Sequence, residues 1–206
     1  SLALPEVTRY QPAGRNQGGE LMRIGLVSDT HGDPGAWEKA MAVLGNVDLI
    51  THAGDVLYHG IFNPITESYD PRGLAGMLNV IEVPMVHARG NCDSEVDQLA
   101  LDNHILSDFA FVSAEGFRIL VTHGHKQPDE RLAEVAGRAN VHLVHRGHTH
   151  VPKIEVVGGV VLFNAGSVAV PKQDGGARTV GLYEEGTLRV LDIDTGEVFA
   201  EGRFPA

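Results

Sequence analysis

The segment IGLVSDTHG, residues 24–32, is the starting point for both the fold and the candidate site of this chain. An apolar run is followed at once by Asp29 and His31, which places both side chains at the carboxyl end of a predicted buried strand. In open α/β sheets, ligands bind in the crevice outside the carboxyl ends of the strands. Two residues apart in extended backbone, Asp29 and His31 point to the same side, and a carboxylate with an imidazole suits manganese, iron or zinc. The segment therefore predicts a metal site.

Four later segments repeat this pattern of an apolar run that ends in metal-ligand residues. They are DLITHAGD (48–55), VPMVHARGNCD (83–93), RILVTHGH (118–125) and VHLVHRGHTH (141–150). One short motif of this kind often arises by chance, but five in succession predict that the strand ends form a single two-metal site. The candidate ligands are Asp29, His31, Asp55, Asn91, His123, His148 and His150.

Composition restricts the class of protein. The 206 residues fit one domain, and 43% hydrophobic and 21% charged residues are ordinary for a globular protein. A net charge of -11 argues against stable binding of a nucleic-acid duplex, whereas bound divalent cations would keep a phosphate-bearing substrate compatible. The single cysteine, Cys92, excludes an internal disulfide and favours a reducing compartment, so we expect a cytoplasmic protein. No apolar run approaches the ~20 residues of a transmembrane helix, and no membrane is expected.

The chain is expected to form a single domain over residues 22–206, preceded by a loose N-terminal extension over residues 1–21. The extension is rich in Pro, Gly, Gln and Asn and lacks the charged and apolar regions of a signal peptide. Met22 stands directly before the first predicted strand and is a candidate native start. N-terminal sequencing of the native protein would test this.

Between Met22 and about Val151, buried strands alternate with helices. Asp33-Pro34, Asp70-Pro71 and Gln127-Pro128 each predict a helix start with proline at the first helical position. After Val151, KIEVV and VVLFN around a Gly-Gly turn predict a hairpin, and TVGLYEE, TLRVLDID and EVFAEGRF predict a meander with one solvated face. An α/β half followed by a β-rich half predicts an α/β fold of two packed mixed β-sheets flanked by helices.

These motifs carry a family resemblance. DTHG, GD-x₃-HG, GNCD, THGH and GHTH, in this order, resemble the blocks of the calcineurin-like metallophosphoesterases, over about residues 22–170. NAGSV (164–168) resembles the loop that follows GHTH in the small bacterial phosphodiesterase branch. The resemblance implies a four-layer αββα sandwich. It also implies one metal held by Asp29, His31 and His150, a second held by Asn91, His123 and His148, and Asp55 as the bridge.

The resemblance further implies the reaction. Asp29 and Asp55 supply two negative charges against four positive charges from two divalent ions, which leaves a positive site for a phosphoryl group. Such ions lower the pKa of bound water from ~15.7 to about 7, so a metal-bridging hydroxide would attack phosphorus directly. Asp55, Asn91 and His123 are the expected catalytic residues. Manganese is the first expectation for the ions, with iron, zinc, nickel or cobalt as alternatives.

One departure from the pattern bears on the substrate. Cys92 stands where protein phosphatases of this superfamily usually have a histidine that assists the leaving group. A thiol with a pKa of about 8.5 is a poor proton donor, which favours diesters over monoesters, unless Cys92 is only a small packed residue. Arg89 is expected to hold a phosphate oxygen or to pair with a carboxylate. His59 and His125 are expected to contact substrate or to orient a metal-bound imidazole.

Several further residues are expected to have structural roles. His52, His87, His142 and His145 lie inside predicted strands, Asp93 and Asp97 are expected to start a helix, and Asn164 and Ser167 to shape a loop. Residues 58–73 form a long loop rich in Pro and Asn, which we expect to lie over the metals and to influence substrate choice.

The sequence thus predicts a dinuclear-metal phosphodiesterase that hydrolyses a small phosphate ester by direct attack of water. A phosphomonoesterase and a nucleotide pyrophosphohydrolase are alternatives within enzymology. A non-catalytic metal-binding scaffold of the same fold, or a phosphate sensor, is the alternative outside it. Self-association into a homo-oligomer is compatible with the sequence.

Overall fold

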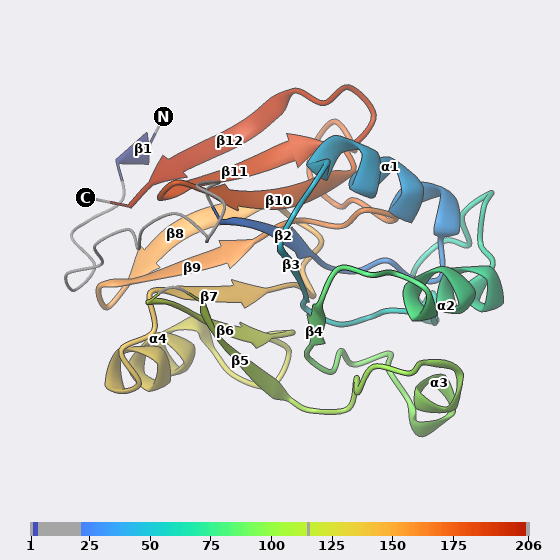
Figure 1. Cartoon of the computed structure of the whole chain (residues 1–206), viewed down its shortest axis with the longest axis horizontal. Helices are drawn as coiled ribbons and strands as arrows, with labels where there is room; N and C mark the ends of the chain where they lie inside the picture. Colours follow the sequence, from blue (N-terminus) through green and yellow to red (C-terminus); the bar gives the residue numbers. More distant parts are fainter. Residues whose placement is uncertain (1, 4–21, 115, 205–206) are drawn as a thin grey trace.

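The fold consists of two β-sheets packed face to face between helices (Figure 1). The computed structural model describes residues 2–3, 22–114 and 116–204. The larger sheet contains β1 (Leu2–Ala3), β2 (Arg23–Val27), β3 (Leu49–His52), β4 (Met85–His87), β10 (Thr179–Glu184), β11 (Thr187–Asp192) and β12 (Val198–Arg203). The smaller sheet contains β5 (Phe109–Ala114), β6 (Phe117–Thr122), β7 (Leu143–Arg146), β8 (Lys153–Val157) and β9 (Val160–Asn164). The helices are α1 (Pro34–Leu44), α2 (Pro71–Asn79), α3 (Glu95–Ala100) and α4 (Asp129–Arg138).

The strand order brings the ligand-bearing strand ends together. The larger sheet runs β1-β12-β11-β10-β2-β3-β4 and the smaller sheet β5-β6-β7-β9-β8. β2, β3 and β4 are parallel neighbours in one sheet, and β6, β7 and β9 are parallel neighbours in the other. Parallel strands have their carboxyl ends at the same edge, where the crevice for ligands lies.

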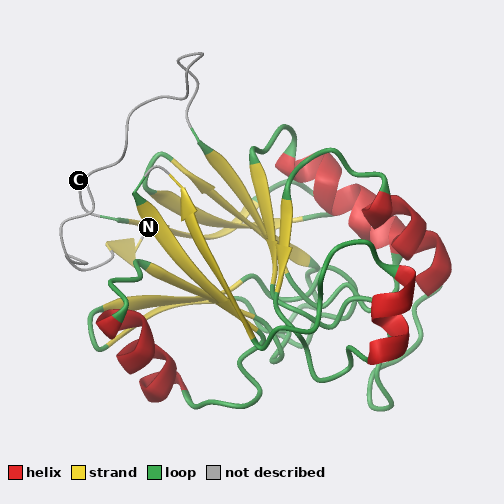
Figure 2. Cartoon of the chain, turned by 60° about the horizontal axis from the view of Figure 1, so that its bottom comes forward, coloured by secondary structure: helices red, strands yellow, loops and turns green. Residues whose placement is uncertain are grey.

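Three apolar layers hold the four structural layers together. Helices lie on the outer sides of the two sheets (Figure 2). Trp37 of α1 and Leu74 of α2 belong to the apolar layer on the larger sheet, and Ala136 of α4 packs with Leu162 on the smaller sheet. Between the sheets lies a core of Leu26, Ala53, Leu143, Phe163, Tyr183 and Val190, all buried. The two-sheet fold flanked by helices is therefore confirmed.

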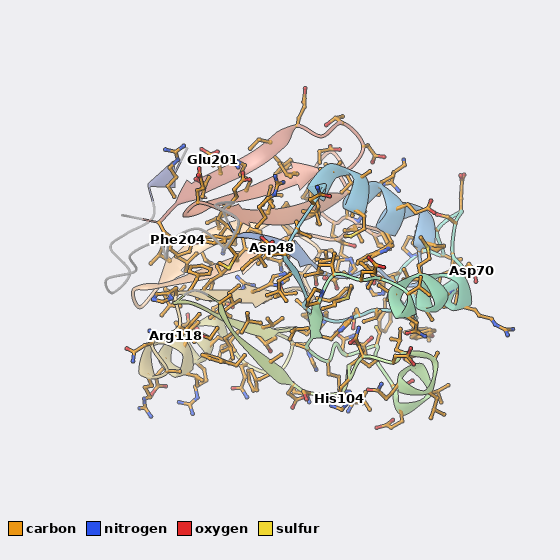
Figure 3. The ribbon with its side chains drawn as sticks, in the orientation of Figure 1. Asp48, Asp70, His104, Arg118, Glu201 and Phe204 are labelled. Carbon is orange, nitrogen blue, oxygen red and sulfur yellow. The ribbon has the colours of Figure 1, made fainter. Side chains whose placement is uncertain are left out.

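Two of the three predicted helix starts are confirmed. The Asp33 carboxylate accepts the Ala36 N–H (2.8 Å) at the start of α1, and Asp70, labelled in Figure 3, accepts the Gly73 N–H (2.9 Å) at the start of α2. The third prediction was wrong in detail. α4 begins at Asp129 with Pro128 one position before it, and no side chain caps it, because proline in place of Asp or Ser has no oxygen to offer.

The prediction for α3 was right for Asp97 and wrong for Asp93. Ser94 is the residue that caps α3, and its side chain and that of Asp97 form a reciprocal capping box. Asp93 is buried and accepts backbone N–H groups from residues near the candidate site instead. Its role is described with that site.

The predicted solvated face of the C-terminal meander was wrong for its first strand. Residues 179–183 of β10 are all buried, because β10 lies inside the larger sheet, with α1 on one face and the smaller sheet on the other. β12, which lies farther out in the same sheet, carries the exposed Val198 and Phe199.

Most of the predicted N-terminal extension lies outside the described residues. Of residues 1–21, the structure describes Leu2 and Ala3, which form β1 and pair in parallel with Gly202 and Arg203 of β12. Among the helices of the described residues, none has the length and apolarity needed to cross a membrane.

Three of the four histidines that we assigned to strands lie in strands and are buried: His52, His87 and His145. His52 accepts the Gly54 N–H at its Nδ1 atom (3.1 Å), and its Nε2 atom lies 3.0 Å from the Thr30 hydroxyl. His87 stacks on His52 with ring centroids 5.3 Å apart, and neither of its ring nitrogens has a hydrogen-bond partner within the described part of the chain. Burial lowers the pKa of His87 to about 4.

We expect His87 to make the metal-free protein sensitive to acid. Between an unfolded pKa of about 6.5 and a folded pKa of about 4, the unfolded chain binds more protons, so stability is lost as the pH falls through this range. At about pH 4.5 the expected loss is about 2.5 kcal/mol relative to about pH 7.5. In His87→Phe, which keeps the stacked ring, the difference between the two pH values should shrink by about that amount.

Urea unfolding of the chelated protein at the two pH values measures this difference. His104→Gln is the matched control, because it removes one imidazole from the exposed surface. An unchanged pH dependence in His87→Phe would refute the assignment.

Candidate metal centre

The predicted ligands meet at the carboxyl ends of the parallel strands. Asp29 follows β2, Asp55 follows β3, and His150 follows β7. One ligand atom from each of Asp29, His31, Asp55 and His150 lies within 4.8 Å of the others, and all four residues are buried. The first predicted ligand group, together with its predicted bridge, is thus gathered in one place.

Backbone carbonyls fix the orientation of three imidazoles. The Nδ1 atom of His31 lies 2.8 Å from the Tyr58 carbonyl oxygen, that of His123 lies 2.8 Å from the Ala53 carbonyl, and that of His150 contacts the Val170 carbonyl. A carbonyl oxygen only accepts, so each Nδ1 atom carries the hydrogen, and Nε2 of the neutral ring presents a lone pair. This is the state in which an imidazole binds a metal ion.

These lone pairs point at other acceptors. The Nε2 atoms of His31 and His150 are 3.2 Å apart. The Oδ1 atom of Asp29 also lies 3.2 Å from Nε2 of His150. Asp29 Oδ1 is buried and has no hydrogen-bond partner among the described residues. Acceptors that face one another need a cation between them, either protons or a metal ion. The donor set therefore fits a divalent metal.

Asp55 connects this group to the second predicted group. Its Oδ2 atom lies 3.8 Å from Nε2 of His31 and 3.4 Å from Nε2 of His123. Asn91 Oδ1 is 3.1 Å from the same nitrogen of His123, while its amide nitrogen donates to the Cys92 sulfur. The ring of His148 lies 5.2 Å from that of His123. His123 and Asn91 thus lie next to Asp55, with the exposed His148 near His123, and a second metal site formed by these three residues stays a prediction.

A proton can provide the missing positive charge when no metal is bound. Burial lowers the pKa of His123, but the hydrogen bond to Asp55 and the negative charges of Asp29 and Asp55 raise it more strongly, to about 9. A site that attracts a proton this strongly has the electrostatic character expected of a cation site.

The backbone at the ligands differs from the extended conformation that we assumed for Asp29 and His31. The φ angle is positive at Asp29 (57°), His31 (44°), Asp55 (59°), His148 (69°) and His150 (58°). Left-handed backbone at residues other than glycine costs of order 1–3 kcal/mol each and is found where the surrounding structure enforces it. The ligands converge because the chain turns sharply after each strand, and not because their side chains alternate.

Buried polar side chains hold these turns. The Asp93 carboxylate accepts the N–H groups of Asp55 (2.9 Å), Val56 (2.8 Å) and Gly90 (2.7 Å). The Ser167 hydroxyl donates to the Asp29 carbonyl (2.7 Å). Likewise, the Asn164 amide donates to the carbonyl of Gly147 (2.6 Å), the first residue of the GHTH motif. Asn164 and Ser167 therefore shape the loops as predicted.

A cavity of about 590 Å³ opens over the ligands. Asp55, Asn91, His148 and His150 line it. Its other lining residues are Tyr58, Gly60, Ile61, Phe62 and Asn63 from the long loop, Cys92, Ser94, Val96 and Asp97 before and within α3, and Lys172. Within the loop of residues 58–73, Tyr58 and residues 60–63 border the cavity. That the loop lies over the metals and influences substrate choice stays a prediction.

The predicted substrate residues differ in their relation to this cavity. Cys92 lines it, and burial together with the neighbouring Asp55 raises the thiol pKa to about 12. The ring of His125 lies 5.3 Å from that of His123, and burial lowers its pKa to about 4. Arg89 donates to the Asp93 carbonyl (3.2 Å) and lies 3.8 Å from Glu95.

His59 packs its ring against two tyrosines. The ring centroids of Tyr58 and Tyr69 lie 4.6 and 5.2 Å from that of His59. Neither His59 nor Arg89 is among the residues that line the cavity in the described structure. Substrate binding by these residues stays a prediction.

Lys172 was missed by the sequence analysis. It lies within PKQDGG, after the last motif, where no periodicity or ligand spacing draws attention to it. Its backbone N–H donates to the His150 carbonyl (3.3 Å), which explains why a residue so far along the chain lines the cavity.

Comparison with known proteins agrees with this geometry. The chain is 34% identical over 183 residues to the phosphodiesterase YfcE of Escherichia coli K12, covering 88% of this chain and 97% of that protein. A solved structure of E. coli YfcE covers 89% of this chain and all of that chain, with a TM-score of 0.78 and 30% identity. Vacuolar protein sorting 29 from Cryptosporidium parvum, with a TM-score of 0.65 over 90% of this chain and 99% of its own, is 17% identical and shares the fold.

The family match includes every predicted ligand. Residues 22–187 match the calcineurin-like phosphoesterase superfamily domain, a range that contains all five strand-end motifs. The expectation of a phosphoesterase of the small bacterial branch is thereby confirmed. The chain belongs to the calcineurin-like phosphoesterase superfamily.

Proposed function

We propose that the protein is a dinuclear-metal phosphodiesterase that hydrolyses a small phosphate ester by direct attack of water. The observation that carries the proposal is the position of Asp55, whose Oδ2 atom contacts one imidazole from each ligand group. One ion would be held by Asp29, His31 and His150. The other ion would be held by Asn91, His123 and His148, and Asp55 would bind both ions. When bound, two divalent ions activate water and stabilise negative charge on the phosphoryl oxygens.

The residues around the candidate site support a diester rather than a monoester. The high pKa of Cys92 keeps its thiol protonated and makes it a poor proton donor to a leaving alkoxide. Among the cavity-lining residues that the structure describes, Lys172 is the one Lys or Arg. A diester carries one negative charge, whereas a monoester or a pyrophosphate carries more and needs more cations. The name phosphodiesterase of the relatives from E. coli and Methanocaldococcus jannaschii points the same way.

The mixed nitrogen and oxygen ligands accept several ions, and manganese is our first choice, ahead of iron, zinc, nickel or cobalt. We also propose a cytoplasmic location, on the basis of the single unpaired cysteine. The net charge of -11 supports the proposal that nucleic-acid duplexes are not partners. A homo-oligomer is compatible with these assignments.

Hydrolysis of bis(p-nitrophenyl) phosphate and p-nitrophenyl phosphate by chelated protein, titrated with Mn²⁺, tests the proposal. We expect metal-dependent hydrolysis of the diester and a lower rate on the monoester. Hydrolysis of the monoester alone would favour the phosphomonoesterase. Tight metal binding without hydrolysis of either compound would favour a scaffold or sensor.

Lys172→Ala is expected to raise KM for the diester about fivefold while kcat changes less than about twofold, because a charge that attracts substrate and transition state equally affects binding alone. Steady-state kinetics at low salt measure both constants. Lys39→Ala is the control, since Lys39 pairs with Asp194 and lies outside the cavity lining. An unchanged KM in Lys172→Ala would exclude a role in substrate binding.

A further inference from the structure

Beside the candidate metal centre, the cavity exposes an apolar surface formed by Ile61, Phe62 and Val96. Their exposed fractions are 79%, 96% and 73%. Two of these residues come from the loop before α2, and Val96 comes from α3, which lies on the same side of the molecule as α2 (Figure 1). Large apolar side chains gathered at the surface beside a polar site mark a place where a ligand or partner is bound.

Several polar groups next to this surface have partners, whereas the buried side-chain oxygen of Asn63 has none among the described residues. Ser94 and Asp97 bond to each other in the capping box of α3, with the hydroxyl 2.9 Å from the carboxylate. The Asn63 amide donates to the His59 carbonyl (2.8 Å), and Asp55 Oδ1 accepts the Cys92 N–H (2.8 Å). Ile61, Phe62 and Val96 therefore offer apolar area without a charged group among them, which suits an uncharged, apolar group.

The apolar surface is fixed in position relative to the metal ligands. The loop is tied to the site through the Tyr58 carbonyl, which holds Nδ1 of His31 (2.8 Å). Gly60 packs so closely on Cys92 that an added Cβ atom would lie 3.0 Å from its sulfur. A binding surface held by such contacts keeps a constant distance from the phosphoryl site.

We propose that Ile61, Phe62 and Val96 bind one ester group of the substrate, and that this group is aromatic or of similar flat apolar shape. This inference rests on the proposed function and names the substrate class for it: phosphodiesters with an aromatic alcohol group. The phosphoryl group occupies the candidate metal centre while the ring covers the three side chains. A methyl ester is too small to cover them and leaves the apolar surface in water.

Binding of phenylphosphonate and methylphosphonate to the Mn²⁺-loaded protein, measured by titration calorimetry, tests this without turnover. Wild type is expected to bind phenylphosphonate about tenfold more tightly, and Phe62→Ser/Val96→Ser should bind the two compounds with affinities within about twofold. The matched control is Ile65→Ser/Leu99→Ser. It removes exposed side chains (64% and 87%) from the same loop and the same helix, but neither residue lines the cavity.

Wild type that binds phenylphosphonate no more tightly than methylphosphonate would overturn the inference, whether or not diesters are hydrolysed. A preference that persists in Phe62→Ser/Val96→Ser would overturn it too. Light scattering tests whether a second copy of the chain covers the surface instead. A wild-type dimer that dissociates in Phe62→Ser/Val96→Ser, with an unchanged preference for phenylphosphonate, would assign the surface to self-association and not to substrate. Failure of the proposed function is separate, because it shows as absence of diester hydrolysis in a wild type that still prefers phenylphosphonate.

Discussion

Asp55→Asn is expected to lower kcat/KM for the diester by about a thousandfold at any Mn²⁺ concentration. Asp55 is the one described carboxylate that contacts imidazoles of both ligand groups, at 3.8 Å from His31 and 3.4 Å from His123. An amide of the same shape keeps one carbonyl oxygen but loses the charge and the second ligand oxygen. The variant should therefore bind fewer metal ions, which elemental analysis of the dialysed protein measures alongside the kinetics.

The fold of Asp55→Asn is expected to stay intact. Asp55 Oδ1 accepts the Cys92 N–H (2.8 Å), and an asparagine carbonyl can accept the same bond. Asp108→Asn is the control for loss of a carboxylate, because Asp108 pairs with Lys126 on the surface. Two bound ions and an undiminished rate in Asp55→Asn would show that Asp55 is not the bridge.

The position of the candidate site was predictable because the strands and the ligand motifs that follow them are encoded locally. Each ligand-bearing motif follows an apolar run, and parallel neighbours bring such ends to one edge. The geometry of the ligands was not predictable in the same way. The left-handed backbone at Asp29 and His31 depends on contacts such as Ser167 with the Asp29 carbonyl, which joins residues 138 positions apart.

The errors have a common physical origin in tertiary contacts. Asp93 precedes a helix and has the chemistry of a helix cap, but its carboxylate is used by Asp55 and Val56, which lie 37 and more positions earlier in the chain. The alternation of β10 suggested a solvated face, which the second sheet covers. Lys172 reaches the cavity through a bond to His150 that no short-range pattern reveals.

Gly90→Ala is expected to disrupt the candidate metal centre, although Gly90 has no side chain to bind a metal. A Cβ atom at this position would lie 2.0 Å from Asp55 Oδ1 and 2.2 Å from the Asp55 backbone nitrogen, far inside any real Cβ contact. Asp55 cannot retreat without breaking the hydrogen bond of its N–H to Asp93 (2.9 Å). We therefore expect a loss of about 3 kcal/mol in the free energy of unfolding, together with weaker Mn²⁺ binding.

Urea unfolding and Mn²⁺ titration of Gly90→Ala measure both effects, with Gly76→Ala as control. Gly76 lies inside α2 with nothing within 4 Å of an added Cβ atom, so alanine there should raise stability by roughly 0.5–1 kcal/mol and leave metal binding unchanged. The backbone is equally crowded at Gly54, where an added Cβ atom would lie 2.4 Å from the Gly90 nitrogen. The turns after β3 and β4 thus approach each other through two glycines, and this close approach places Asp55 between the two ligand groups. A Gly90→Ala protein with wild-type stability and metal affinity would contradict it.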